Sequence, residues 1–217
     1  MTIPLVIPRR RLLVPGGGGG SPLVAIGGAS AAAASFVVNP LSLGAQDGDF
    51  MLVASVWESS NAVSTPAGWT EDVDEQAAFG NAFARWSWAS RIFSGTPPGD
   101  QTFSYGGSNN VAWNWVILRG VTGIGTITKN TPTLGTGSFS FAVTIGSEGA
   151  LAWVCYDGGA QDPTAVADMT NIAANGRAED IAGMYGELAW IDASDTIVAA
   201  TSPFDKGIGG YMWAPVN

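Results

Sequence analysis

Residues 49–56 read Asp-Phe-Met-Leu-Val-Ala-Ser-Val, and residues 149–156 read Gly-Ala-Leu-Ala-Trp-Val-Cys-Tyr. Each stretch is a short apolar run that begins beside Gly or Asp, which is typical of a buried strand. The two stretches lie 100 residues apart, and residues 67–70, 87–89 and 111–115 are matched in the same order by residues 167–170, 189–191 and 209–213. Repetition at this spacing predicts a body built from two similar halves, about 21–121 and 122–217.

The rest of the body shows the same pattern of short apolar runs between clusters of Gly, Pro, Asp and Asn, without a long amphipathic helix. We therefore expect an all-β fold, a single pseudo-twofold β-sandwich of jelly-roll type over residues 21–217. The predicted strands are residues 22–26, 35–39, 50–58, 82–93, 101–105, 111–119, 138–145, 150–156, 183–191, 196–200 and 210–214.

The composition excludes several classes of function. The chain has 217 residues, of which 46% are hydrophobic and 12% charged, so it can bury a substantial core. It has no His and one Cys, which excludes a Ser-His or Cys-His catalytic pair, a His-ligated zinc ion and an internal disulfide. No apolar run reaches the roughly 20 residues of a membrane-spanning helix. We expect no enzymatic activity, no cofactor and no membrane partner.

The net charge of -9 is distributed unevenly along the chain. The first 46 residues carry three arginines and no carboxylate, so the remaining residues carry a net charge of -12. A body of this charge repels phosphate backbones, and we expect no nucleic-acid partner.

Residues 1–20 have a different character from the body. Pro4, Pro8 and Pro15 exclude a continuous helix and favour an extended arm, and Gly16–Gly20 form a flexible tether. The apolar residues of such an arm can add a strand to an exposed sheet edge, while its arginines bind an acidic surface of another copy or of a shell protein. The other interpretation is that the arm folds back onto its own sandwich. The candidate partner-binding residues are Ile3, Leu5, Val6, Ile7, Arg9, Arg10 and Arg11.

Tryptophan residues occur in pairs that share a face of a predicted strand, because their members lie two positions apart. A tryptophan face can stack on sugar rings, but a sandwich with few Leu and Ile also needs large side chains in its interior. We favour interior packing for the pairs Trp86 with Trp88 and Trp113 with Trp115. The candidate glycan-stacking residues are Trp57 and Trp69, which lie near predicted loop ends, although a Trp side chain that plugs the end of the sandwich is equally common there.

The densest charge cluster places four carboxylates in five positions, at Glu71, Asp72, Asp74 and Glu75. Oxygen-rich loops bind calcium, which makes these residues weak calcium candidates. Their spacing does not match an EF-hand loop, and a solvated acidic loop explains the cluster without a metal. We therefore predict a loop here and no metal site.

Three motifs carry a resemblance to a known kind of module: Gly48–Val53, Pro66-Ala67-Gly68-Trp69-Thr70 and Ile117–Val121. Their order resembles a β-sandwich module that recurs in bacteriophage virion proteins and some secreted bacterial proteins. The resemblance extends from about Ser35 to the C-terminus, although residues 167–170 depart from the Gly-Trp signature. It implies a building block of a head or tail surface and carries over no catalytic residue.

The expected function is that of a non-enzymatic virion structural protein, a capsid decoration or surface appendage on the outer surface of a bacteriophage. Its expected partner is the major capsid protein or another virion protein, with homo-oligomerisation as well and a trimer as the working assumption. The alternative is a carbohydrate-binding module of a phage tail tip or fibre, or of a secreted bacterial protein, that binds a host glycan. Exposed Trp side chains would favour the alternative, and buried ones would count against it.

Overall fold

The computed structural model describes residues 22–57, 61–79, 82–130, 138–157, 174–179, 184–192, 196–201 and 208–217. This part of the chain is all-β, as predicted, and within it no helix is long and apolar enough to cross a membrane. The strands are β1 (Leu23–Val38), β2 (Phe50–Trp57), β3 (Thr70–Phe79), β4 (Ala82–Ile92), β5 (Gln101–Leu118), β6 (Thr128–Asn130), β7 (Ser138–Ala142), β8 (Gly149–Asp157), β9 (Ala174–Glu179), β10 (Met184–Ile191), β11 (Thr196–Thr201) and β12 (Ile208–Val216).

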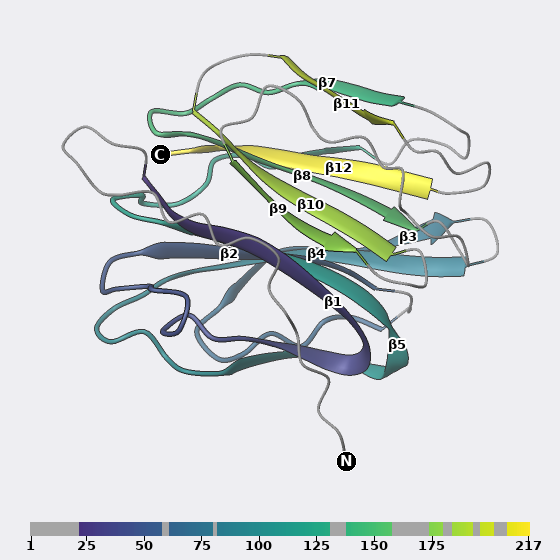
Figure 1. The fold of residues 1–217 in the computed structure, drawn as a ribbon, viewed down its shortest axis with the longest axis horizontal. Helices are drawn as coiled ribbons and strands as arrows, with labels where there is room; N and C mark the ends of the chain where they lie inside the picture. The colour runs from purple at the N-terminus through teal and green to yellow at the C-terminus, as the bar shows by residue number, and fades with distance from the viewer. Residues whose placement is uncertain are drawn as a thin grey trace.

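Two five-stranded antiparallel sheets pack face to face, and a two-stranded sheet covers the outer side of the second (Figure 1). Sheet A has the order β1-β5-β2-β4-β3, and sheet B has the order β6-β12-β8-β10-β9. The covering sheet pairs β11 with β7. All of sheet A precedes residue 121 and all of sheet B follows it, with β5, β2, β4 and β3 in the same succession as β12, β8, β10 and β9.

The spacing of 100 residues between the first pair of similar strands is wrong by one residue. Leu52 faces the core between the sheets, whereas Ala152, its counterpart at that spacing, faces the opposite side of sheet B. Leu52 lies opposite Val116, two residues before the end of β5, and Leu151 lies opposite Ala214, two residues before the end of β12. Leu151 is therefore the structural counterpart of Leu52. A shift of one position in the alignment moves every side chain of a strand to the opposite face of the sheet. Sequence similarity does not reveal this shift, because both strands are apolar on both faces.

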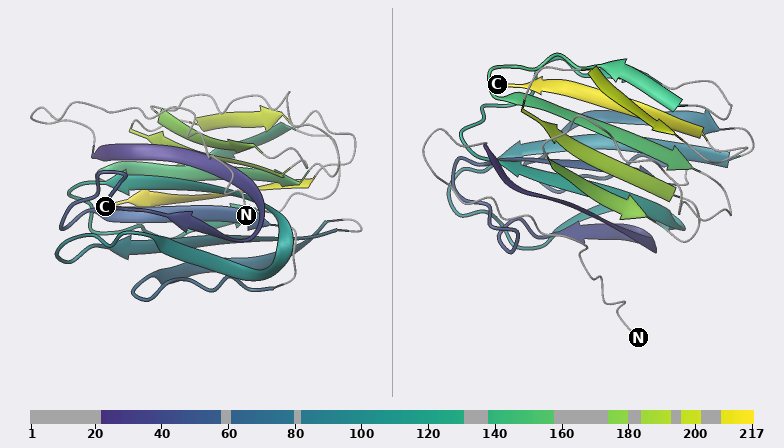
Figure 2. Two further views of the ribbon diagram at one scale, coloured as in Figure 1. Left: turned by 60° about the horizontal axis from the view of Figure 1, so that its bottom comes forward. Right: turned by 45° about the horizontal axis from the view of Figure 1, so that its top comes forward.

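Strands β1 and β5 each join two of the predicted strands into one long, bent strand. Their register shifts where Ala33 pairs with Asn109 and Ser35 pairs with Ser104, so β5 carries extra residues at this point. Gly106 has a φ of 64° there, a backbone conformation that favours glycine. The C-terminal part of β1 and the N-terminal part of β5 curl together, and they lie beneath the rest of sheet A (Figure 2).

The curled sheet and the covering sheet create three apolar cores instead of one. The first lies between sheets A and B and contains Trp86 and Trp88. The second lies on the other side of sheet A, where the ends of β1 and β5 cover it, and contains Trp113 and Trp115. The third lies between sheet B and β7. None of these four Trp residues is more than 9% exposed, which confirms the predicted interior packing.

The two sheets are joined by a buried carboxamide and by a contact between backbones. Asn114 of β5 accepts a hydrogen bond from Trp153 Nε1 at 2.8 Å and donates to the carbonyls of Gly176 and Gly186 at 2.9 and 3.1 Å. A Cβ atom added to Gly176 would lie 2.5 Å from the carbonyl oxygen of Gly27. Strands β1 and β9 therefore approach so closely that only glycine fits at this contact.

Two of the motifs that carry the resemblance meet in an ion pair. Arg119 Nε and Nη2 bind the two carboxylate oxygens of Asp49 at 2.9 and 3.0 Å, and the backbone N–H of Gln46 donates to the same carboxylate at 2.9 Å. Asp49 is 1% exposed, and its hydrogen bond raises the pKa of Arg119. The pair ties the start of β2 to the end of β5.

We predict that Gly176→Ala lowers the free energy of unfolding by about 2 kcal/mol or more, because the new methyl group overlaps the backbone of Gly27. Gly99→Ala is the matched control, since an added Cβ there has no neighbour within 4 Å. Urea unfolding of both variants measures the difference. Equal stability of the two variants would show that β1 and β9 are not in close contact.

We also predict that Arg119→Met lowers the free energy of unfolding by about 2 kcal/mol, because it leaves the buried Asp49 carboxylate without its cation. Arg91→Met is the control, since the Arg91 guanidinium donates to the carbonyl of Ala67 and lies over the Phe93 ring instead of binding a carboxylate. Thermal unfolding should show the larger loss for Arg119→Met, and a larger loss for Arg91→Met would contradict the assignment.

Candidate functional site

The acidic cluster lies on strand β3, so the prediction of a loop at residues 71–75 is wrong. Val73 is buried in the core between the sheets, and it anchors the strand opposite Trp88 of β4. The register shifts between Glu71 and Val73, where Asp72 forms a bulge. Four of the five residues 71–75 are charged, so the sequence pattern does not indicate a strand. Val73, the one apolar residue among them, enters the core and makes the segment a strand.

Strand β3 is at one edge of sheet A, and in the described part of the chain it pairs with β4 alone. An open pocket of about 350 Å³ adjoins it. The pocket extends from β3 to the segment that leads into β6, the strand at the edge of sheet B farthest from β9. Its lining residues are Asp72, Val73, Ile124, Gly125, Ile127 and Lys129. The sandwich is thus closed tightly beside β1 and β9 and hollowed beside β3 and β6.

Two basic residues pair with two of the four carboxylates on β3. Asp74 binds Arg85 of β4, with 2.7 Å between Oδ2 and Nη2, and Glu75 binds Lys129 of β6. The hydrogen bond from Arg85 to Asp74 raises the pKa of the guanidinium. The four carboxylates exceed these two cations by two negative charges.

The other two carboxylates are held in less favourable surroundings. Burial raises the pKa of Glu71, and the neighbouring charge of Asp74 raises it further. Burial also raises the pKa of Asp72, against a hydrogen bond from Ser90 that lowers it. Asp72 Oδ2 is buried without a hydrogen-bond partner among the described residues. Across these ranges no three carboxylate or thiol groups gather in a way that would hold a metal ion.

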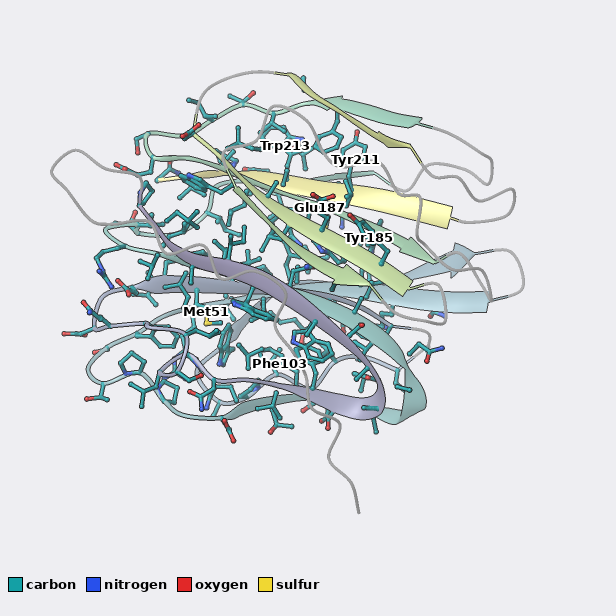
Figure 3. The ribbon with its side chains drawn as sticks, in the orientation of Figure 1. Met51, Phe103, Tyr185, Glu187, Tyr211 and Trp213 are labelled. Atoms are coloured by element: carbon teal, nitrogen blue, oxygen red, sulfur yellow. The ribbon has the colours of Figure 1, made fainter. Side chains whose placement is uncertain are left out.

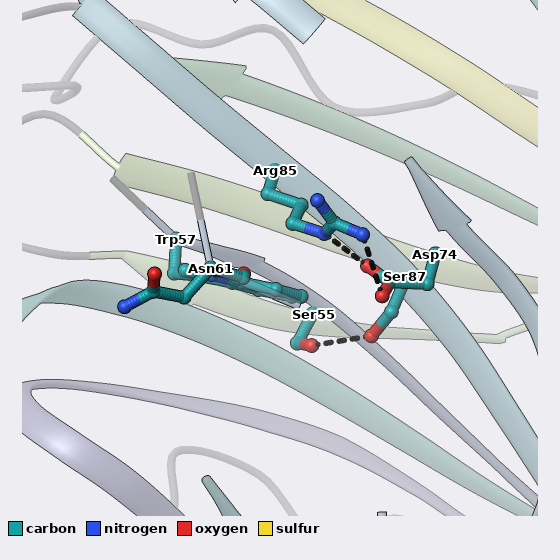
Figure 4. A network of polar contacts seen from close by, with 6 residues as sticks. All are labelled: Ser55, Trp57, Asn61, Asp74, Arg85 and Ser87. Carbon is teal, nitrogen blue, oxygen red and sulfur yellow. Dashed lines mark hydrogen bonds and ion pairs between the residues drawn. The ribbon is translucent and has the colours of Figure 1, made fainter. Parts of the chain in front are cut away.

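A polar network lies beside the Asp74–Arg85 pair (Figure 4). The hydroxyl groups of Ser55 and Ser87 are hydrogen-bonded at 2.9 Å, and both residues are buried. Trp57 Nε1 donates to the carbonyl of Asn61 at 3.2 Å. These contacts satisfy polar atoms that β2 and β4 bury, and the chain has no His to activate a serine.

The prediction that Trp57 and Trp69 are exposed for glycan stacking is wrong. Trp57 is 0% exposed and stacks on Tyr105, with 5.4 Å between ring centroids. Trp69 is 8% exposed, meets the Phe103 ring edge-on at 5.1 Å, and donates to Gln101 Oε1 at 3.2 Å. Both residues lie near strand ends, but the curl of sheet A encloses them in the second core.

A second buried carboxylate, Glu187, lies in the third core (Figure 3). Tyr185 donates its hydroxyl hydrogen to Glu187 Oε2 at 2.6 Å, and both residues are 0% exposed. Beside them the Tyr211 ring stacks on Phe141 at 4.2 Å. The Glu187 carboxylate is therefore enclosed in this core, where it accepts a hydrogen bond from a neighbour on its own strand.

The arm residues named from the sequence, from Ile3 to Arg11, lie outside the described residues, as do residues 167–170. The structure brings Glu71, Asp72, Asp74 and Glu75 together along one sheet edge. The sequence does not predict the apolar lining of the adjoining pocket, Ile124 and Ile127. Isolated isoleucines within a Gly- and Thr-rich segment give no periodic signal.

Comparisons with protein-family models, with curated proteins and with solved structures found no match for this chain.

We predict that Asp72→Asn stabilises the protein at pH 7. Burial raises the pKa of the folded carboxyl above its ordinary value of 3.8, so deprotonation destabilises the folded state as the pH rises above about 4. The amide carries no charge, and the expected gain is on the order of 0.5 kcal/mol after solvent screening. Thermal unfolding at pH 3 and pH 7 should show the gain only at pH 7. Asp192→Asn, at an exposed site, is the control, and a gain at pH 3 would contradict the prediction.

Proposed function

We propose that this protein is a non-enzymatic structural component of a bacteriophage particle. It is a head decoration or surface appendage on the outer surface of the virion. Residues 1–20 attach it to neighbouring chains, either the major shell protein or further copies of itself. The resemblance of the three sequence motifs to virion β-sandwich modules supports the class of protein, and the properties of the body support the mode of attachment.

The observation that carries the proposal is the contrast between the surface of the body and the arm. Within the described ranges only Val37, Leu41 and Ile92 are large hydrophobic residues with exposed side chains. Residues 3–7, Ile-Pro-Leu-Val-Ile, are apolar throughout. The arm is therefore the part of the chain best suited to make apolar contacts with a partner.

The charge of the body fits an outward position. A net charge of -12 after residue 46 keeps a surface soluble when it is repeated in many copies. The buried hydroxyls, carboxylates and indoles of the body serve its own cores, which suits a building block better than an enzyme. The carbohydrate-binding alternative loses the two residues named for it, because Trp57 and Trp69 are interior.

We predict that deleting residues 1–20 lowers binding to purified particles, or to their major shell protein, at least tenfold. The deletion removes both the apolar segment and the three arginines. The control replaces Gly16–Gly20 with serine, which keeps the arm and a flexible tether, and circular dichroism checks that each variant folds. Co-sedimentation with particles measures binding.

Equal binding of the full-length and deleted chains would show that the arm is incidental. Retention of the body on host polysaccharide, without binding to particles, would replace the structural role with carbohydrate recognition.

A further inference from the structure

We propose that the edge of β3 with which no described strand pairs is the receiving site for the arm of a second copy of this chain. Residues 3–11 of that copy add to β3 as a further strand and place apolar side chains in the pocket between β3 and β6. This inference rests on the proposed function, because it takes the arm to be the segment that attaches the protein to its neighbours.

The backbone of β3 offers the pairing. Strand β3 has ten residues, and in the described structure β4 uses only one side of it. The other side presents N–H and C=O groups, which form a template for an added strand. At about 3.3 Å per residue, the nine residues from Ile3 to Arg11 span about 30 Å and match β3 in length.

The pocket beside β3 offers the apolar contact. Val73, Ile124 and Ile127 contribute apolar side chains to its lining, and all three belong to or pack against the core between the sheets. Aliphatic side chains placed there would extend this core beyond the edge strands. On the opposite side of the sandwich, Gly27 and Gly176 leave no comparable space.

The alternation of aliphatic residues with proline in the arm suits a strand at the edge of a sheet. In an extended strand Ile3, Leu5 and Ile7 share one face, and the backbone N–H groups of these residues point toward the same neighbour. Pro4 and Pro8 occupy the alternate positions, whose N–H groups would point away from β3. The missing N–H groups therefore cost no hydrogen bond to β3, and they prevent a further strand from adding to the arm.

Charge complementarity favours this occupant over an acidic or neutral segment. The carboxylates of β3 exceed Arg85 and Lys129 by two negative charges. The apolar part of the arm is followed directly by Arg9, Arg10 and Arg11. Opposite charges at the end of an added strand fix its position and speed its association.

The place where the arm joins the body favours a second copy as the donor. The arm precedes β1, which is at the opposite edge of sheet A from β3, with β5, β2 and β4 between them. An arm that crossed this sheet to its own β3 would also attach the protein to nothing. Mutual exchange of arms between two copies gives a dimer, and one-way donation from copy to copy gives a ring when the rotation between copies closes.

The test is disulfide formation between two full-length variants of different mass. One carries Leu5→Cys, and the other carries Thr126→Cys, an exposed position between two residues that line the pocket. Native Cys155 is 1% exposed and does not compete. We expect a mixed disulfide on mild oxidation. Replacing the second variant with Thr102→Cys, an exposed position on the β1 side of sheet A, should yield none.

A second measurement tests the direction of the arm's N–H groups. Leu5→Pro removes a donor to β3 and should weaken self-association at least tenfold in sedimentation equilibrium, whereas Val6→Pro removes an N–H that points away and should leave it unchanged. Both substitutions precede the predicted body at residues 21–217, and circular dichroism checks that each variant folds.

The inference is overturned if no mixed disulfide forms, if a chain carrying both cysteines links only to itself, or if the two proline variants behave alike. Binding to particles without the mixed disulfide would leave the proposed function standing and remove this inference. Formation of the mixed disulfide without binding to particles would support the pairing of the arm with β3 and would overturn the proposed function.

Discussion

One buried carboxamide determines how the two sheets meet. Asn114 is 0% exposed, and it contacts a tryptophan indole and two backbone carbonyls of sheet B. A hydrogen-bonded amide in an apolar core permits only one relative position of its partners, because any shift leaves a buried polar group without a bond. The residues that accept its bonds, Gly176 and Gly186, are glycines, and a Cβ atom at either would collide with the neighbouring layer.

The hydrogen bonds of Asn114 hold the two sheets close together, and Gly27 and Gly176 make that close approach possible. The pocket beside β3 and β6 is a consequence of this close contact at the opposite edge. Sheets that touch through their backbones at one edge, and that carry Trp86 and Trp153 between them farther along, cannot stay equally close at the other edge. The space beside β3 and β6 is the consequence of that difference. Charged residues then occupy the rim of the space, where Lys129 and Glu75 bind each other across the two sheets.

The sequence predicted those features that depend on local pattern. Runs such as Phe50–Val56 predicted the central strands, and the spacing of Trp86 and Trp88 predicted a shared interior face. It failed where long-range packing decides. The sequence indicates loop ends near Trp57 and Trp69, but the curl of β1 and β5 encloses both side chains, and that curl depends on a bulge beside Gly106. Strand β3 was hidden because only Val73 among its first six residues enters a core.

The two halves of the chain place strands in the same order but use the last strand of each sheet differently. Strand β9 carries Gly176, and its backbone is covered by β1 of the other sheet. Strand β3 has the equivalent place in sheet A but carries carboxylates at four positions near its start. An edge that bears glycine can be buried against another backbone, whereas an edge with several carboxylates requires cations or water. One arrangement of strands thus yields a closed side, where two backbones meet, and an open side, where the carboxylates of β3 outnumber Arg85 and Lys129.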